Sequence, residues 1–154
     1  NTLLKTTGNY HESCYISITS VYMIKALIRL GVMPNKTKFE TIPKIPQELV
    51  PHFIRGFFDG DGIVSCKKYK AVGFVSNYHM LNQIEDCIPL GTSIVKHWKT
   101  EGIGTRMTGS KDKAKRLHDY MYTNSTICLK RKHDTLKAII DGNTEVTCRN
   151  TNIQ

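Results

Sequence analysis

Two acidic side chains, Asp59 and Asp61, have the spacing and setting of cation ligands. They close the stretch 53–62, in which a mostly apolar run with one internal glycine is followed by Asp-Gly-Asp-Gly. The apolar run has helical length, and the two closing glycines disfavour continuation of the helix. Both carboxylates therefore lie at the C-terminal end of a helix, where the negative end of the helix dipole adds to their charge. Carboxylate oxygens suit Mg²⁺ or Ca²⁺, and Mg²⁺ is usually held by one or two carboxylates plus substrate phosphates.

Other interpretations of this stretch are an EF-hand loop and an ordinary helix end. If Gly62 is the invariant glycine of an EF-hand loop, the first and twelfth positions fall on Phe57 and Lys68, where acids are required. That interpretation fails. A helix end with two solvated aspartates remains open. The internal glycine, Gly56, favours a helix–helix interface over an ordinary helix end, because a glycine lets another backbone approach closely.

The stretch resembles the signature of the LAGLIDADG homing endonucleases. Asp59-Gly60-Asp61-Gly62 stand where that family has Asp-Ala-Asp-Gly, and Gly56 stands for its internal glycine. Arg55 and the two aromatic residues 57 and 58 depart from the pattern. The resemblance implies an α+β protein with the LAGLIDADG homing-endonuclease fold. This fold is an αββαββα repeat with a curved antiparallel sheet and a motif helix at the repeat interface.

The secondary structure expected along the chain has the same order. Hydrophobic spacing predicts a short strand from residue 15, a helix through residue 29 capped by Ser20, and a motif helix that begins between Pro46 and Pro51. The elements expected after the motif are strands 63–67 and 71–76, helix 78–88, strands 93–98 and 103–108, helix 110–122 and helix 133–140. From the motif helix to the helix 110–122 this is the order α-β-β-α-β-β-α, and the helix 133–140 follows it.

A comparison of the chain with itself suggests a second repeat. Residues 15–38 and 105–132 share the order strand, Ser-capped helix, turn and lysines, at an offset close to 90 residues that brings Leu27 opposite Leu117 and Leu30 opposite Tyr120. We therefore expect residues 1–50 to be the C-terminal part of a preceding repeat plus a linker. Residues 51–142 would be a complete repeat and 143–154 a loose polar tail. The expected partner is a second repeat, either a missing N-terminal half of the same chain or a homodimer mate. The interface residues would be Phe53, Ile54, Gly56, Phe57 and Asp59.

The resemblance also implies a site for phosphodiester hydrolysis. Asp61 corresponds to the family's metal-binding acid, with the backbone carbonyl of Gly60 as its companion and Mg²⁺ as the expected cofactor, other divalent cations being possible. Lys130 resembles the family's catalytic-site lysine, with Lys132 as a substitute, and Asn77 stands where a polar residue orders water. In the earlier repeat, one of the lysines at 36 and 38 would have the same role. The alternative for each of these lysines is an ordinary solvent-exposed charge with no role in catalysis.

Recognition of double-stranded DNA would use the sheet. Alternate residues of a strand face one side, so Ser65, Lys67 and Tyr69 share a face that the resemblance places in the major groove. Lys70 and Arg106 are expected to contact phosphates. Residues 63–132 contain thirteen Lys or Arg against five Asp or Glu, a balance of +8 within a net charge of +9. This excess favours a polyanionic partner, although a solvated basic surface is the simpler alternative.

The composition is that of a globular protein, with 40% hydrophobic and 23% charged residues in 154. No apolar run has the length that a bilayer requires, and there is no signal-peptide pattern. The five scattered cysteines have no C-x-x-C spacing, which favours reduced thiols in the cytoplasm and argues against zinc.

The sequence thus favours a site-specific, metal-dependent endonuclease that cuts both DNA strands. The alternative is the same fold as a nucleic-acid-binding module without cleavage, either an RNA maturase or a degenerate endonuclease. A basic structural protein with no site would leave the stretch 53–62 unexplained.

Overall fold

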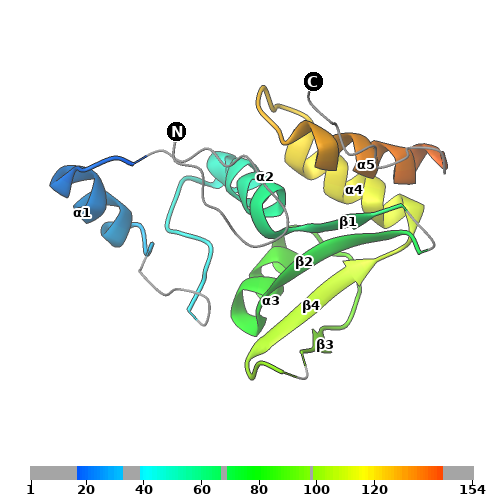
Figure 1. Cartoon of the computed structure of the whole chain (residues 1–154), viewed down its shortest axis with the longest axis horizontal. Coiled ribbons are helices and arrows are strands. Elements are labelled where there is room, and N and C mark those ends of the chain that lie inside the picture. The colour runs from blue at the N-terminus through cyan, green and yellow to red at the C-terminus, as the bar shows by residue number, and fades with distance from the viewer. Residues whose placement is uncertain (1–16, 33–38, 67–68, 98, 144–154) are drawn as a thin grey trace, which may run out of the picture.

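The computed structural model describes residues 17–32, 39–66, 69–97 and 99–143 (Figure 1). The order of elements is α1 (Val21–Arg29), a 3₁₀ turn η2 (Gln47–Leu49), α2 (Val50–Asp61), β1 (Ile63–Ser65), β2 (Ala71–Asn77), α3 (Tyr78–Cys87), β3 (Val95–Lys96), β4 (Ile103–Thr108), α4 (Lys111–Tyr122) and α5 (Lys130–Asp141). From α2 to α4 this is the expected order, and α5 follows it.

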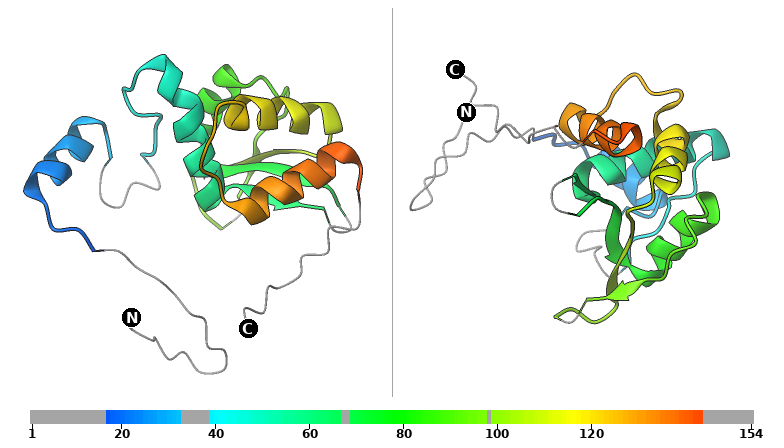
Figure 2. Two further views of the ribbon diagram at one scale, coloured as in Figure 1. Left: turned by 90° about the horizontal axis from the view of Figure 1, so that it is seen from above. Right: turned by 90° about the vertical axis from the view of Figure 1, so that its right-hand side faces the viewer.

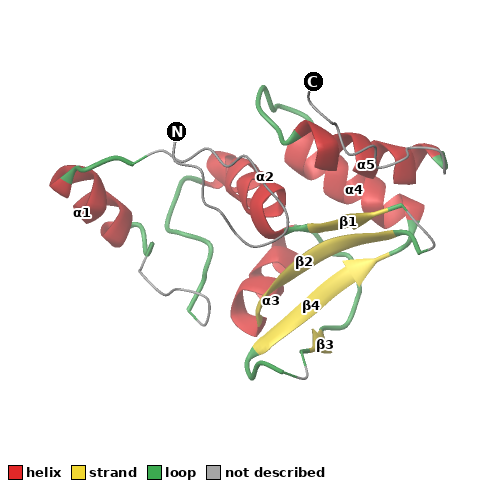
Figure 3. Ribbon diagram, viewed as in Figure 1, coloured by secondary structure: helices red, strands yellow, loops and turns green. Residues whose placement is uncertain are grey.

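The strands form one antiparallel sheet in the order β1-β2-β4-β3 (Figure 3). β1 and β2 are a hairpin in which Ile63 pairs with Gly73. The chain then passes through α3, so that β4 returns beside β2, with Phe74 opposite Arg106. The short β3 pairs with the outer edge of β4. The protein is therefore an α+β protein built around a four-stranded antiparallel sheet, an arrangement that several fold families share.

Helices α2 to α5 pack together with one face of this sheet. α2 and α3 contact β2, and α4 and α5 form an antiparallel pair beside α2 (Figure 2). α2 turns Val50, Ile54 and Phe58 inward, one residue every four, as a helix with a single buried face must. The ring of Phe58 meets Phe74 of β2 edge to face, with the centroids 5.6 Å apart. α2 is thus held in the core by its own chain.

One apolar residue of the motif helix therefore differs from expectation. Ile54 has no exposed surface, so it cannot contact a partner, and the interface prediction for Ile54 is wrong. Phe57, partly buried, stacks on Phe74 with the ring centroids 6.1 Å apart. Phe53 is also partly buried. The side chains of the motif helix mainly build the core, and its exposed residues include Gly56, Gly60 and Asp61.

Helix α1 forms where the sequence predicts it, but it packs differently from the other helices. The hydroxyl of Ser20 accepts a hydrogen bond from the amide of Met23 at 3.2 Å, which makes Ser20 the expected N-cap. None of the residues of α1 is buried, and Val21, Ile24 and Ile28 are 66%, 51% and 47% exposed. Figure 1 shows α1 set apart from the sheet and the other helices. Its apolar side chains lack the burial that stabilises the equivalent side chains of α4.

Several boundaries differ from the sequence-based expectation, and those of β3, of α5 and of the first strand differ most. β3 has two residues instead of six, and α5 begins at Lys130 instead of residue 133. The strand expected from residue 15 lies partly outside the described residues, and residues 17 and 18 are not in a strand. The polar tail lies outside them from residue 144 onwards. Within the described part of the chain, no helix is both long and apolar enough to cross a membrane.

Candidate functional site at the end of helix α2

The C-terminal end of α2 presents Asp61 to solvent. Asp61 is the last residue of the helix, and Gly62 leaves it in an extended conformation with φ −67° and ψ 150°. A side chain at Gly62 would meet the Phe58 ring, because a Cβ built there lies 2.3 Å from it. The glycine therefore lets the chain turn from the helix directly into β1. This turn leaves the carboxylate of Asp61 exposed at the helix tip, as the sequence predicts.

Lys132 of α5 closes the same helix end. Its ammonium donates hydrogen bonds to the carbonyls of Phe58, Gly60 and Gly62, at 2.7, 3.1 and 2.7 Å. The residue is only 5% exposed. Burial lowers the pKa of Lys132, and the charge of Arg131 lowers it further, whereas the carboxylates of Asp59 and Asp61 raise it. Lys132 is thus a helix cap that opposes the negative end of the dipole. It gives the carbonyls of Gly60 and Gly62 a donor, and it gives the Phe58 carbonyl a second one beside the amide of Gly62.

This cap changes the interpretation of two predicted site residues. The Gly60 carbonyl, predicted as a metal ligand, already accepts a hydrogen bond from Lys132. Lys132, predicted as a substitute catalytic lysine, has its ammonium directed at backbone carbonyls. It still contributes a positive charge beside Asp61.

Asp59 faces its own chain. One carboxylate oxygen accepts a hydrogen bond from the Tyr122 hydroxyl at 3.1 Å, and the other accepts one from the backbone amide of Leu129 at 2.9 Å. These bonds connect the tip of α2 to the end of α4 and the start of α5. Burial raises the pKa of Tyr122 above its ordinary value, and the negative charge of Asp59 adds to this effect. Both oxygens of Asp59 thus hold neighbouring helices of its own chain, and its predicted place at an intermolecular interface stays a prediction.

Lys130 and Asn77 have local partners. Lys130 is exposed on the first turn of α5, 2.6 Å from Asp134, and this hydrogen bond raises the pKa of Lys130. Asn77 is buried at the end of β2, where its side chain accepts from the amide of Met80 at 2.8 Å and donates to the carbonyl of Glu40 at 2.9 Å. Asn77 is thus the N-cap of α3. The roles predicted for these residues in catalysis and water ordering stay predictions.

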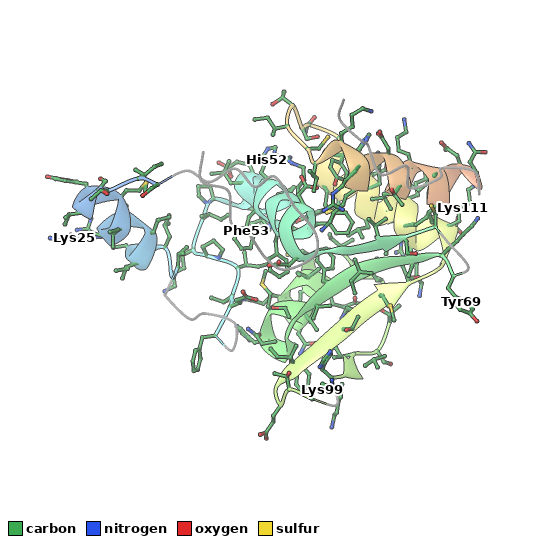
Figure 4. All side chains as sticks on the ribbon, in the orientation of Figure 1. Lys25, His52, Phe53, Tyr69, Lys99 and Lys111 are labelled. Carbon is green, nitrogen blue, oxygen red and sulfur yellow. The ribbon has the colours of Figure 1, made fainter. Side chains whose placement is uncertain are left out.

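The residues predicted to contact DNA separate into two groups. Ser65 lies on the sheet face opposite the core, because its neighbours Val64 and Cys66 pack inward. Tyr69 is exposed and Lys70 half-buried in the turn between β1 and β2, and Lys67 lies outside the described residues. Figure 4 shows Tyr69 directed away from the body of the protein. The strand residues that share the face of Ser65 are uncharged: Ile63, Ala71, Gly73, Val75, Thr105 and Met107.

The prediction that Arg106 contacts DNA phosphates is wrong, because its side chain is buried. Arg106 pairs with Phe74 across β2 and β4, so its side chain points to the core face, and the residue is only 7% exposed. The guanidinium lies 3.1 Å from the carboxylate of Glu85 and donates hydrogen bonds to the Thr92 carbonyl and the Asn82 side chain. Arg106 therefore joins β4 to α3 and the loop that follows α3, and it is not available to a phosphate.

The tip of α2 offers a hard oxygen ligand of the kind that Mg²⁺ prefers, but only part of a complete ligand set. Asp61 offers one exposed carboxylate, and the described residues contain no group of three or more His, Cys, Asp or Glu that could hold a metal ion. Mg²⁺ accepts such a minimal donor set when substrate phosphates and water complete its coordination. Two features have no counterpart in the sequence argument: the cap by Lys132 and a pair of histidines, His118 and His133, between α4 and α5. Both depend on contacts between segments distant in sequence, and no local pattern indicates them.

Comparison of the chain with protein-family models, with curated proteins and with solved structures found no match.

Proposed function

We propose that this chain is a LAGLIDADG-type, site-specific DNA endonuclease that hydrolyses phosphodiester bonds on both strands with the help of Mg²⁺. The observation that supports this best is the exposed carboxylate of Asp61 at the tip of α2, immediately before a four-stranded antiparallel sheet. The motif and the element order that follow it are those expected of one αββαββα repeat. The basic charge of the chain suits a DNA partner.

A second repeat would complete the site. Gly56 and Gly60 are four residues apart on one face of α2, and a Cβ at either position would meet nothing within 4 Å. This bare face lets another helix approach to backbone contact. In this proposal the partner is a second LAGLIDADG repeat, either an N-terminal half of the same protein or a second copy of the chain. It would bring a second acid next to Asp61, and the two would share cations with the scissile phosphates.

Bound Mg²⁺ would polarise the phosphate and lower the pKa of bound water. Asp61 would hold it through its exposed carboxylate. Lys132, fixed by three carbonyls, places its positive charge beside this carboxylate and supports the end of α2 on which Asp61 lies. The chain's own contribution is thus a rigid helix tip with an exposed acid.

Contacts with DNA would be made mainly at the turns. The uncharged strand face that includes Ser65 suits close approach to base edges, whereas phosphates require cations. Tyr69 and Lys70 lie at the β1–β2 turn, Lys99 lies between β3 and β4, and Lys111 begins α4 (Figure 4). In this proposal these residues flank the sheet and contact the two backbones.

A second candidate function is nucleic-acid binding without cleavage. One observation favours it: both lysines predicted for catalysis already have partners within the chain. Lys130 forms an ion pair with Asp134, and Lys132 donates hydrogen bonds to backbone carbonyls. A degenerate endonuclease would bind DNA without cutting it, whereas an RNA maturase would bind RNA in preference to DNA.

The test is a cleavage and binding assay with a selected target duplex in Mg²⁺. Asp61→Asn keeps the size and helix position of the side chain but removes its charge, so we expect cleavage to fall at least a hundredfold with DNA affinity changed less than threefold. Asp86→Asn, at an exposed residue of α3, is the matched control and should cut normally. Cleavage by Asp61→Asn at the wild-type rate would refute the assignment of Asp61. Binding without cleavage by the wild-type chain paired with its second repeat would favour the second candidate.

Salt dependence tests the DNA partner itself. If six or more phosphates are contacted, affinity should fall by roughly a thousandfold or more between about 50 and 200 mM salt, because bound counterions are released. Lys70→Ala should weaken binding and make the affinity less dependent on salt. Arg106 is buried in an ion pair with Glu85, so we do not expect it to contact a phosphate. A salt-independent affinity would argue against DNA as the partner.

A further inference from the structure

Two histidines face one another across the α4–α5 pair. Nε2 of His118 lies 3.4 Å from Nε2 of His133, and the ring centroids are 5.3 Å apart. Tyr122 packs against both rings, with centroid distances of 5.2 and 4.9 Å. The side chains of the histidines are 20% and 25% exposed, so small solutes can reach them. The pair is therefore a preorganised, accessible cluster of two imidazoles.

Neighbouring carboxylates determine which ring nitrogens are protonated. Nδ1 of His118 is 3.2 Å from Oδ1 of Asp119, and Nδ1 of His133 is 3.2 Å from Oδ1 of Asp134. An ionised carboxylate only accepts hydrogen bonds, so Nδ1 must be the donor in each ring. In a neutral imidazole, Nε2 then has a lone pair and no proton. Two such lone pairs facing each other at 3.4 Å repel one another unless a cation or a proton lies between them.

We propose that His118 and His133 bind a divalent transition-metal ion, with Zn²⁺ as the representative, through their Nε2 atoms. Two nitrogens at 2.0–2.1 Å from a tetrahedral metal are about 3.3 Å apart, and their ring centroids are about 5.2 Å apart. The observed separations, 3.4 and 5.3 Å, agree with both values. Rings that share one proton head-on would place their centroids about 5.7 Å apart at the same nitrogen separation.

The surroundings also suit such an ion. Each aspartate that fixes an imidazole is a carboxylate–histidine partner of the kind that orients metal-binding histidines. Both aspartates are paired with lysines as well, Asp119 with Lys115 and Asp134 with Lys130. These charges balance one another, so no excess positive charge from these pairs repels a cation. Among the described residues no third His, Cys, Asp or Glu joins the pair, so water completes the coordination. Imidazole ligands favour Zn²⁺, Ni²⁺ or Cu²⁺ over Mg²⁺.

The ion would act as a clamp between α4 and α5. Tyr122, which contacts both imidazoles, also donates its hydroxyl proton to Asp59 at the tip of α2. The proposed metal site therefore adjoins the framework that supports Asp61 but shares no ligand with it. The inference does not depend on nuclease function.

The test is a titration of the full chain with Zn²⁺, measured by isothermal titration calorimetry at neutral pH. We expect one equivalent to bind, with an affinity at least tenfold lower in His118→Gln and in His133→Gln. His97→Gln, at an exposed histidine after β3, is the matched control and should bind normally. Cys128→Ser should also bind normally, and loss of binding in that variant alone would assign the metal to the thiolate and overturn the proposal.

A second measurement does not require the variants to fold. In NMR spectra of the wild-type chain, the first equivalent of Zn²⁺ should shift the Nε2 resonances of two histidines and leave the others unchanged. Lowering the pH should release the metal, because protons compete for the Nε2 lone pairs. Absence of stoichiometric binding, or a shift of other histidines, would overturn the proposal.

Discussion

At the scale of single residues, Lys132 has the largest structural role near Asp61. A lysine ammonium has three donors, and all three can be satisfied by the carbonyls of Phe58, Gly60 and Gly62. The Gly60 carbonyl lies in the last turn of α2, where carbonyls lack a partner within the helix, whereas the Phe58 carbonyl also accepts the amide of Gly62. The sequence argument considers Lys132 only as a catalytic group, because its spacing relative to the motif reveals nothing about contact across 70 or more residues.

We expect Lys132→Met to lower the free energy of unfolding by about 2–3 kcal/mol, because three carbonyls at the end of α2 lose a charged donor. Urea denaturation measures this change. Lys130→Met is the matched control, and it should leave stability unchanged because Lys130 is exposed and paired only with Asp134. Equal stability of the two variants would show that the contacts of Lys132 do not support α2.

The hydroxyl of Tyr122 gives a pH prediction. Its pKa is raised in the folded protein by burial and by the charge of Asp59, so the folded state keeps the proton to higher pH than the unfolded chain. The resulting stability is fully present below about pH 10, the ordinary pKa of tyrosine, and is lost as pH rises above it. Tyr122→Phe should cost about 1–2 kcal/mol at pH 7 and should flatten the loss of stability above pH 10. Tyr22→Phe, at a fully exposed tyrosine, should change neither quantity.

At the scale of elements, the glycines of α2 and β2 have opposite roles. A Cβ at Gly56 would meet nothing within 4 Å, whereas a Cβ at Gly73 would lie 2.1 Å from the backbone oxygen of Arg106. Gly56→Ala should therefore stabilise the isolated chain by about 0.5–1 kcal/mol through helix propensity alone. Gly73→Ala should destabilise it, because β2 and β4 must separate. Thermal unfolding of the two variants measures both effects, and a destabilised Gly56→Ala would show that the face of α2 is already covered.

Local patterns predict the elements well and their mutual contacts poorly. The cap of α1 by Ser20, the β1–β2 hairpin and the end of α2 at the glycines all depend on residues close in sequence, and the structure contains them. The side of the sheet that Arg106 faces depends on the register between β2 and β4, which no local pattern determines. The early start of α5 has a similar cause, since the tertiary hydrogen bond from the Leu129 amide to Asp59 fixes its first turn.

At the scale of the whole molecule, the described structure leaves two surfaces without packing partners. One is the bare glycine face of α2, and the other is the apolar side of α1, with Ile24 and Leu27 exposed. By the internal comparison, Leu27 corresponds to Leu117 of α4, which is completely buried. The difference between these equivalent leucines is the strongest structural sign that the region before α2 needs further packing. Exposed apolar area of this kind usually marks an interface.

We therefore expect the 17.5 kDa chain to associate in solution, with a mass that rises with protein concentration in sedimentation equilibrium. Gly56→Leu should shift the equilibrium towards monomer, because a branched side chain on the bare face of α2 keeps a second helix at a distance. The same substitution should not lower the unfolding free energy of the monomer, since it meets open space there. The double variant Ile24→Glu and Leu27→Glu separates the two surfaces: weaker association in it alone would place the contact on α1 instead of α2. A chain that remains monomeric at all concentrations, and that also fails to bind a second repeat in a Gly56-dependent manner, would contradict the proposed interface in both of its forms.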